Sequence, residues 1–258
     1  MKYSNKFNLK NKIAYVVGGS GLIGQEICLG LSEFGAKVLN LDLKNNRKFQ
    51  VNKKKIEFCN FNVKNLNSSK KLFDKIVKKY GVPNIFINCS YPYNSSWKKS
   101  GFSNVNVRSF QENVNLHMNS YIWLARLAAE KMKKKKISGS IIQLGSIYGV
   151  VGQNLNIYRG TNIKENITYS AIKGGIVNST RLMASYYGKN NIRVNTICPG
   201  GIENGQSKKL KKQYALQVPL KRMCAAHEIP SAVVFLASEA SSYVTGTTLM
   251  VDGGWTAI

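Results

Sequence analysis

Residues 13–24 read Ile13-Ala14-Tyr15-Val16-Val17-Gly18-Gly19-Ser20-Gly21-Leu22-Ile23-Gly24, an apolar run that ends in a glycine-rich loop. Gly19, Gly21 and Gly24 have the spacing G-x-G-x-x-G, directly after a strand-like run and at the start of a helix-like one. Glycines permit a tight turn and a close approach of the backbone to a pyrophosphate, and the helix N-terminus offers free N–H groups and partial positive charge. The stretch therefore predicts a strand–loop–helix unit that holds a dinucleotide.

Strand-like and helix-like segments alternate outward from this unit along the whole chain. The predicted strands are apolar with little alternation, as expected when both sheet faces are covered, and they are Ile13–Gly18, Lys37–Leu41, Ile56–Asn60, Ile85–Asn88, Ser140–Gly145, Arg193–Cys198 and Thr248–Val251. The predicted helices begin near Leu22, Leu66, Asn104, Tyr169, Gln206 and His227. This alternation favours an α/β fold with one doubly wound (Rossmann) parallel sheet of about seven strands, flanked by helices. Residues 1–258 would form a single domain, with the ligand crevice at the carboxyl ends of the strands.

The second predicted strand is followed by Asp42, near 20 residues past the glycines. An acid at this position suits hydrogen bonds to a ribose 2′-hydroxyl and would repel a 2′-phosphate, which favours NAD(H). Lys44 and Arg47 follow closely and would soften that preference, so NADP(H) stays open as the alternative.

The net charge of +26, from 38 Lys and Arg against 12 Asp and Glu, is unusually high. The excess is nearly all lysine, whereas planar bidentate contacts to phosphate favour arginine. The lysine runs are also scattered, at Lys53–Lys55, Lys133–Lys136 and Lys208–Lys212. This pattern argues against a nucleic-acid partner and favours a small-molecule substrate with anionic groups, which the charge would steer toward the protein.

The apolar stretches are far shorter than a membrane span, and the polar segment Met1–Asn11 does not resemble a signal peptide. The five cysteines show no C-x-x-C pair and no metal-ligand spacing, so they predict no metal site. Most lie in apolar runs, as buried thiols do in a reducing compartment. A cytoplasmic location without a membrane partner is therefore expected.

The segment Tyr169-Ser170-Ala171-Ile172-Lys173 places Tyr169 and Lys173 four residues apart, on one face of a helix. A free tyrosine has a pKa near 10, too high for efficient proton transfer at neutral pH. A nearby lysine ammonium and a positively charged nicotinamide would both favour the phenolate. The pair therefore predicts an acid–base centre beside a nicotinamide ring.

Several further motifs, in order along nearly the whole chain, resemble the short-chain dehydrogenase/reductase family. They are Val114-Asn115, Gly139-Ser140-Ile141-Ile142-Gln143-Leu144-Gly145-Ser146, the tyrosine–lysine segment, Arg193-Val194-Asn195-Thr196-Ile197-Cys198-Pro199-Gly200, Thr245-Gly246 and Val251-Asp252-Gly253-Gly254. They look like the family's Asn-bearing helix, its fifth strand with the catalytic Ser, its acid–base pair, its sixth strand with a Pro-Gly turn, and its last strand.

The resemblance implies a role for each of four residues. Tyr169 would exchange the proton at the hydroxyl or carbonyl oxygen, Ser146 would orient that oxygen, Lys173 would bind the nicotinamide ribose, and Asn115 would hold a water in a proton relay. The glycine loop and the resemblance together place the cofactor against Gly18, Gly19, Ser20, Gly21, Leu22, Ile23, Gly24, Asp42, Asn62, Val63, Asn88, Cys89, Ser90, Tyr169, Lys173, Pro199, Gly200 and Ile202.

The chain departs from the family pattern in four places. Gly18 replaces the usual Thr, and the glycine spacing is closer to that of the longer, nucleotide-sugar-modifying branch. Asn62 stands where the adenine-binding Asp is expected, which should weaken but not abolish adenine binding. Asn88 is followed by the bulkier Tyr91 and Pro92 in place of a small turn. The interval between Ser146 and Tyr169 is also longer than is common.

Two segments are expected to surround the substrate. The long loop Tyr148–Ile167, with Tyr158, Arg159 and Lys164, should lie at the mouth of the crevice and suits a sugar-like substrate. Residues 201–217 match the family's mobile lid, and Lys208, Lys211 and Lys212 would share one face of a helix there. The family also commonly forms tetramers or dimers through two helices, here Asn104–Lys133 and Tyr169–Gly188, whose surplus apolar residues include Trp123, Leu127, Leu182 and Tyr186.

These observations favour an NAD(P)-dependent oxidoreductase that interconverts a secondary alcohol and a ketone on a sugar or sugar derivative. A weaker resemblance, through Ser146-Ile147-Tyr148-Gly149 and Tyr158, points to enzymes of acidic-sugar and surface-polysaccharide pathways. Three alternatives stay open: a 3-oxoacyl-[acyl-carrier-protein] reductase, a nucleotide-sugar dehydratase or epimerase with bound NAD, and a non-catalytic dinucleotide sensor or nucleic-acid binder. The sequence leaves the substrate and the reaction direction undetermined.

Overall fold

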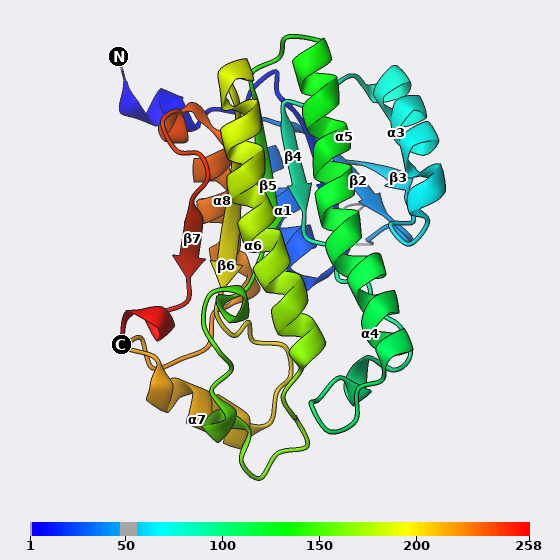
Figure 1. Cartoon of the computed structure of the whole chain (residues 1–258). Helices are drawn as coiled ribbons and strands as arrows, with labels where there is room; N and C mark the ends of the chain where they lie inside the picture. The colour runs from blue at the N-terminus through cyan, green and yellow to red at the C-terminus, as the bar shows by residue number, and fades with distance from the viewer. Residues whose placement is uncertain (1, 47–55) are drawn as a thin grey trace.

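The computed structural model describes residues 2–46 and 56–258, so Arg47 and the run Lys53–Lys55 lie outside the described residues. Seven parallel strands form one sheet in the order β3-β2-β1-β4-β5-β6-β7 (Figure 1). Their bounds are β1 Ile13–Val17, β2 Lys37–Asp42, β3 Ile56–Asn60, β4 Ile85–Asn88, β5 Gly139–Leu144, β6 Ile192–Pro199 and β7 Thr248–Val251. The predicted doubly wound parallel sheet is confirmed, and each strand lies within one residue of its predicted position at both ends.

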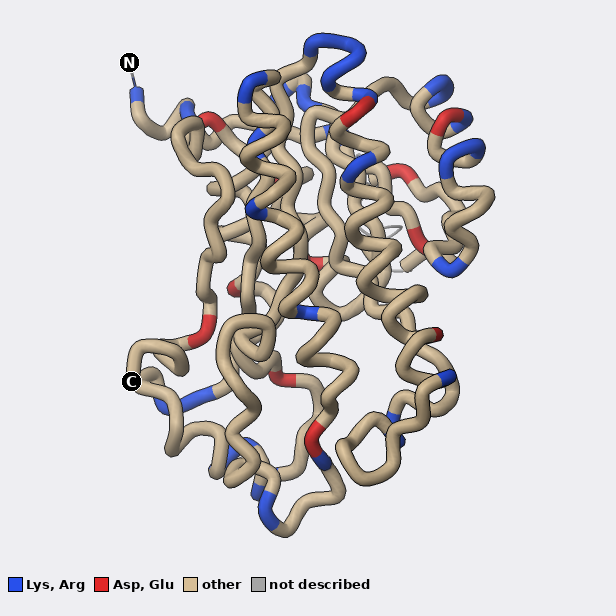
Figure 2. Tube along the Cα trace, in the orientation of Figure 1, with Lys and Arg blue, Asp and Glu red and all other residues tan. Residues whose placement is uncertain are grey.

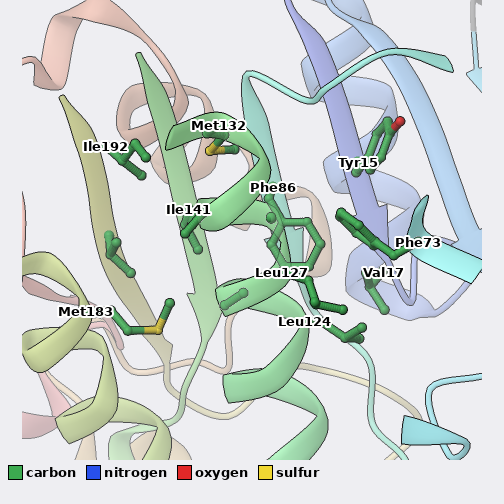
Figure 3. Close-up of a cluster of buried hydrophobic side chains, with 14 of the residues drawn as sticks. Tyr15, Val17, Phe73, Phe86, Leu124, Leu127, Met132, Ile141, Met183 and Ile192 are labelled. Carbon is green, nitrogen blue, oxygen red and sulfur yellow. The ribbon is translucent and has the colours of Figure 1, made fainter. Parts of the chain in front are cut away.

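Helices cover both faces of the sheet, as the continuous apolar strands require. On one face α3 (Leu66–Tyr80), α5 (Ser120–Lys134) and α6 (Ile167–Tyr187) bury side chains such as Phe73, Leu124 and Met183 against Tyr15 and Phe86 of the strands (Figure 3). On the other face α1 (Leu22–Glu33) and α8 (Ile229–Ala237) pack on a second apolar cluster. The two clusters thus pack the helices against both faces of the sheet.

Capping side chains account for most of the helix starts that differ from the prediction. α1 and α3 begin at Leu22 and Leu66 as predicted, and α8 begins at Ile229, two residues after the predicted position. The remaining three begin after a residue whose side chain accepts a hydrogen bond from the backbone three residues on: Asn106 before α4 (Val107–Asn113), Asn166 before α6, and Ser207 before α7 (Lys208–Gln217). These caps place α4 three residues later, α6 two earlier and α7 two later than predicted.

Because all strands are parallel, their carboxyl ends meet at one edge of the sheet. In the register, Val17 of β1 lies opposite Asn88 of β4 and Leu41 of β2, and Leu144 of β5 lies opposite Ile197 of β6. Beyond this edge, α7 and the loop after β5 form a small apolar cluster of their own, which includes Tyr214, Val218 and Trp255. The loops that carry the predicted site residues therefore converge at this edge.

Positive charge is spread over the surface (Figure 2). Lysines occur along α3, at the end of α5 and in the first half of α7, and few acidic residues lie among them. Ion pairs such as Lys131–Asp74, at 2.5 Å, and Lys37–Glu57, at 3.0 Å, neutralise only a few of these charges. No helix within residues 2–46 and 56–258 is long and apolar enough to cross a membrane.

Candidate active site

A cleft of about 1400 Å³ opens at the carboxyl edge of the sheet, lined by the loops that follow β1, β2, β3, β4, β5 and β6. A pocket for one drug-sized ligand commonly measures about 300–1,000 Å³. The cleft is therefore large enough for two ligands side by side, such as a dinucleotide and a substrate.

The glycine loop forms one end of the cleft. Gly18 has φ of +83°, and a Cβ there would lie 2.6 Å from Cα and N of Ser90, so the loops after β1 and β4 touch through this glycine. Gly24 is equally confined, since its Cβ would lie 2.1 Å from the Gly18 carbonyl oxygen. Helix α1 begins after Gly21 with no side-chain cap. Its first N–H groups thus face the cleft, and the fit to a pyrophosphate is good.

Asp42 ends β2 and joins the glycine loop. Its Oδ2 accepts a hydrogen bond from Ser20 N at 2.9 Å, and its Oδ1 accepts one from Leu43 N at 2.7 Å. Ser20 Oγ donates to the Lys44 carbonyl at 2.6 Å. Asp42 and Lys44 both line the cleft. Asp42 and Lys44 therefore lie at the same end of the cleft, where the sequence analysis expects the adenosine ribose of the cofactor to bind.

The remaining predicted cofactor residues differ in exposure. Asn62 and Val63 line the cleft, and the Asn62 side-chain oxygen already accepts a hydrogen bond from Lys64 N at 2.9 Å. Cys89 and Ser90 also line the cleft, whereas Asn88 is buried behind them and its Oδ1 accepts from Ser90 Oγ at 2.8 Å. Two of the predicted cofactor residues, Gly19 and Asn88, do not line the cleft, so they support the loops that form its surface.

Tyr169, Lys173 and Ser146 come together in the middle of the cleft. Asn166 caps α6 by accepting from Tyr169 N at 2.8 Å, which fixes the first turn that carries Tyr169. Lys173 is one turn further and buried; its Nζ donates to the Leu144 carbonyl at 2.8 Å and lies 5.7 Å from the Tyr169 ring centre. Ser146, directly after β5, is hydrogen-bonded to Tyr169. The predicted spacing thus does place the tyrosine and lysine on one helix face.

Burial dominates the protonation of this group. It raises the pKa of Tyr169 to about 12, although the hydrogen bond with Ser146 pulls the other way. Burial also lowers the pKa of Lys173 to about 7. The net result is a raised pKa of Tyr169, and not the lowered pKa that the sequence argument expects from the neighbouring lysine. A positively charged nicotinamide ring is the group that would lower this pKa when bound.

Asn115, the fourth predicted catalytic residue, does not line the cleft. It is exposed, and its side-chain oxygen accepts a hydrogen bond from Asn119 Nδ2 at 3.0 Å. Two residues on, His117 is fully buried, with its ring centre 5.2 Å from that of Tyr91 and 5.3 Å from that of Tyr121. The sequence argument overlooked His117, because a histidine within an apolar helix segment carries no spacing signal of its own.

Aromatic side chains form the substrate end of the cleft. On one side Tyr91, Tyr93 and Trp97 pack on each other, and the rings of Tyr91 and Trp97 lie 6.1 and 6.2 Å from that of Tyr169. On the other side the hydroxyl oxygens of Tyr148 and Tyr158 are 3.1 Å apart. The long loop does lie at the cleft as predicted. The sequence analysis did not predict the aromatic group of Tyr91, Tyr93 and Trp97, which precedes α4. The bulk of Tyr91 and Pro92 was the one feature of this segment that it noted.

The lid segment places its charges outside the cleft. Pro199, Gly200 and Ile202 line the cleft as predicted, and α7 contributes Leu210 and Tyr214. Its lysines lie on the opposite, solvent-facing side, where Lys211 pairs with Glu203. The predicted use of these lysines to bind an anionic substrate therefore has no geometric support.

The long loop likewise turns its charges outward, since Arg159 and Lys164 are exposed and do not line the cleft.

Within residues 2–46 and 56–258, no three histidine, cysteine or acidic residues are grouped as metal ligands.

Comparisons with known proteins show which family the chain resembles. A sequence model of the family described as enoyl-(acyl carrier protein) reductase matches residues 19–256. The chain is 32% identical over 254 residues to the post-translational flagellin modification protein A of Campylobacter coli, across 96% of this chain and 99% of that protein. It is 26% identical over 263 residues to a 2-dehydro-3-deoxy-D-gluconate 5-dehydrogenase of Dickeya dadantii, across 98% of each. A crystal structure of a short-chain dehydrogenase from Leptospira borgpetersenii with bound NAD⁺ has a TM-score of 0.87 and 31% identity, across 99% of this chain and 96% of that chain.

The uncapped N-terminus of α1, the buried Lys173 and Ser146 and the half-buried Tyr169 define a dinucleotide-dependent oxidoreductase on a Rossmann sheet. Together with the relatives, they identify the family: the chain belongs to the short-chain dehydrogenase/reductase family. It is an NAD(P)-dependent oxidoreductase that interconverts a CH–OH group and a carbonyl.

Proposed function

We propose that the protein uses NAD(H) to interconvert a secondary alcohol and a ketone on a sugar or sugar derivative. The nicotinamide supplies or accepts the hydride. Tyr169 exchanges the proton at the substrate oxygen, Ser146 orients that oxygen, and Lys173 binds the nicotinamide ribose. The observation that carries the proposal is that Tyr169, Ser146 and Lys173 line one cleft together with the aromatic side chains of Tyr91, Tyr148 and Tyr158.

The preference for NAD(H) rests on Asp42. Its carboxylate is held in place by Ser20 N and Leu43 N at the cofactor end of the cleft, where a 2′-phosphate would meet a fixed negative charge. Fluorescence titration should give a lower Kd for NADH than for NADPH. The Asp42→Asn variant should narrow that difference, because it keeps the side chain's shape and removes its charge. Tighter binding of NADPH by the unaltered protein would mean that Lys44 outweighs Asp42.

The proposed substrate class follows from the surface that faces Tyr169. Sugar rings have apolar C–H faces and hydroxyl edges, which suit aromatic rings that carry hydroxyl groups. Tyr91 and Tyr93 are each about half exposed, at 48% and 50%, so their surfaces are available to a ligand. Among the residues that the structure describes, the charged ones that line the cleft are Asp42, Lys44, Lys64 and Lys173, and apart from Lys173 they lie at or after the strand ends at the cofactor end. The reacting ring is therefore held by ring faces and hydroxyl groups.

The experiment is a cofactor-reduction screen over sugar alcohols, sugar phosphates, sugar acids, nucleotide sugars and a 3-hydroxyacyl thioester. We expect turnover of a sugar, with a KM that changes little with salt and is unaffected by changing all of Lys208, Lys211 and Lys212 to Gln. Faster turnover of the thioester would support the acyl-carrier-protein alternative. A KM that rises steeply with salt concentration, and that is also higher in the triple variant, would mean that these lysines bind the substrate.

We also propose that the protein assembles as a dimer or tetramer through α5 and α6. Leu182 and Tyr186 of α6 are 72% and 51% exposed, and Trp123 of α5 is 37% exposed, so three of the four predicted interface residues reach the surface. Leu127 does not, because it packs in the core of the monomer at 5% exposure (Figure 3). Light scattering should give a mass above that of one chain, and Leu182→Arg should lower it. A monomer at micromolar concentration would contradict this proposal.

A further inference from the structure

One turn of π-helix, Val114–Asn119, lies between α4 and α5 and packs against α6, the helix that carries Tyr169 and Lys173. A π turn accommodates one extra residue in a helix and is frequent at functional sites. Here Asn115 faces solvent and His117 is buried on the side of the site. The residue that this turn buries near the site is therefore His117.

His117 lies one aromatic ring away from both members of the acid–base pair. Its ring contacts Tyr91, whose own ring is 6.1 Å from that of Tyr169. It also contacts Tyr121, and Lys173 Nζ is 5.1 Å from the centre of the Tyr121 ring. The titratable groups that face His117 from the surrounding elements are thus Tyr91, Tyr121 and Lys173.

Neither imidazole nitrogen of His117 has a hydrogen-bond partner among the described residues. A buried polar atom without a partner costs about 1–3 kcal/mol, so buried imidazoles normally bond to something. Since no group in residues 2–46 and 56–258 bonds to them, we infer that both nitrogens bond to molecules that are not protein. Water is the molecule that most often bonds to buried polar atoms without a protein partner.

The imidazole is also in the form that passes protons. Burial and the neighbouring Lys173 charge hold the pKa of His117 well below its ordinary value of 6.5. A neutral imidazole has one N–H donor and one nitrogen acceptor, and it can accept a proton at one nitrogen while releasing another from the second.

We propose that His117 is a positioning residue that holds the water connecting Lys173 to solvent, the task that the family resemblance assigned to Asn115. The proposal rests on the proposed function, because it concerns the proton that alcohol oxidation releases. The aromatic contacts of His117 fix its ring, and its two nitrogens, with no protein partner among the described residues, are the groups that bind the water on either side.

The proton balance needs such a route. In oxidation the substrate's C–H hydrogen leaves as a hydride to NAD⁺, and its O–H proton goes to the Tyr169 phenolate. The net change is CH–OH + NAD⁺ to C=O + NADH + H⁺. Tyr169 must then lose one proton before the next turnover. That proton passes by way of Lys173 and a water to one nitrogen of His117, while the other nitrogen releases a proton outward. In reduction each transfer reverses.

The first test does not depend on turnover. The chain has two histidines, His117 and the surface residue His227, so the His227→Gln protein contains a single imidazole. We expect ¹⁵N NMR of that protein to show one protonated and one unprotonated nitrogen on His117 at pH 7. Two protonated nitrogens at pH 7 would overturn the proposal, because the ring could then accept no proton.

The second test is kinetic and uses the substrate found in the screen. His117→Phe keeps an aromatic ring and removes both nitrogens. We expect kcat to fall about tenfold, less than the 10²–10⁴-fold cost of losing a direct acid–base group, with the Kd for NADH unchanged. The solvent deuterium isotope effect on kcat should increase, since proton release becomes slower. His227→Phe is the matched control and should leave both quantities unchanged.

Other outcomes separate the competing explanations. If His117→Phe does not fold, His117→Leu, which also has no polar side-chain atom, is measured in its place, with the same expected fall and isotope effect. A normal kcat and isotope effect in the folded variant would overturn the proposal and leave His117 as a packing residue. A lower kcat and a larger solvent isotope effect in Asn115→Ala, with neither change in His117→Phe, would mean that Asn115 and not His117 holds the relay water. Failure of the unaltered protein to turn over any sugar would refute the proposed function, while the NMR result would still decide whether His117 is neutral.

Discussion

Gly18→Ala and Gly21→Ala add the same methyl group to the same loop, and the structure predicts different consequences. Gly18 has φ of +83°, and its Cβ would lie 2.6 Å from two backbone atoms of Ser90. Gly21 has φ of −73°, and its Cβ would lie 3.4 Å from its nearest neighbour, which is an ordinary contact. The first methyl group must push β1 and β4 loops apart, whereas the second has space.

The two costs can be worked out separately. A left-handed backbone costs a residue with a Cβ about 1–2 kcal/mol, and overpacking a rigid site costs about 1–3 kcal/mol more. Gly18→Ala should thus lower the free energy of unfolding by about 2–5 kcal/mol, a large part of the 5–15 kcal/mol typical of a folded domain. At Gly21, the N-cap of α1, alanine replaces glycine at a cost of about 0.5–1 kcal/mol.

Urea denaturation of both variants without cofactor measures the difference, and NADH titration adds a second observable. Gly18→Ala should lose both stability and NADH binding. Gly21→Ala should keep most of its stability but bind NADH more weakly, because its methyl group lies at the helix N-terminus that faces the cleft. Equal losses of stability in the two variants would refute the steric reasoning, as would a Gly18→Ala protein as stable as the original.

Two further predictions concern the acid–base pair. Tyr169→Phe should lower kcat by about 10²–10⁴-fold and leave the Kd for NADH nearly unchanged, whereas Lys173→Ala should impair both turnover and NADH binding. Stopped-flow kinetics and NADH titration measure these two quantities. Near-normal turnover by Tyr169→Phe would refute the assignment of Tyr169 as the acid–base residue. The second concerns pH: the pKa of Lys173 falls from its ordinary 10.5 to about 7 on folding, so between those values the unfolded chain binds more protons and the free energy of unfolding rises with pH. Lys173→Met should reduce that rise between pH 7 and 9 in urea denaturation, and an identical pH dependence in both proteins would contradict the buried, weakly basic lysine.

Local patterns were sufficient to predict the elements of the sheet. Each strand is rich in apolar residues, and the run from Ile13 to Gly24 has a strand, a loop and a helix start at fixed spacing. Helix starts were predicted less well where a capping side chain decides them. Asn166 and Ser207 show this, because their effect depends on a hydrogen bond that forms only when the backbone turns.

The sequence also predicted some features of the active site and not others. The tyrosine–lysine spacing predicted a shared helix face, since four residues make about one turn. It did not predict that burial would raise the pKa of Tyr169 and lower that of Lys173, because desolvation depends on what the rest of the chain packs around them. The lysines of α7 show the same limit: their spacing predicts a common face, but not whether that face is turned to the cleft or to water.

By itself, then, the sequence determined the parallel sheet, the glycine loop, the acid–base pair and the family, because each follows from residues close together or in a fixed order along the chain. The tertiary structure alone decided that Gly18 meets Ser90, that Tyr91 and Trp97 pack against Tyr169, and that His117 is buried in place of Asn115. These contacts join segments tens of residues apart, or depend on a single extra residue in a helix turn. No local pattern specifies such contacts, since they exist only once the layers have packed.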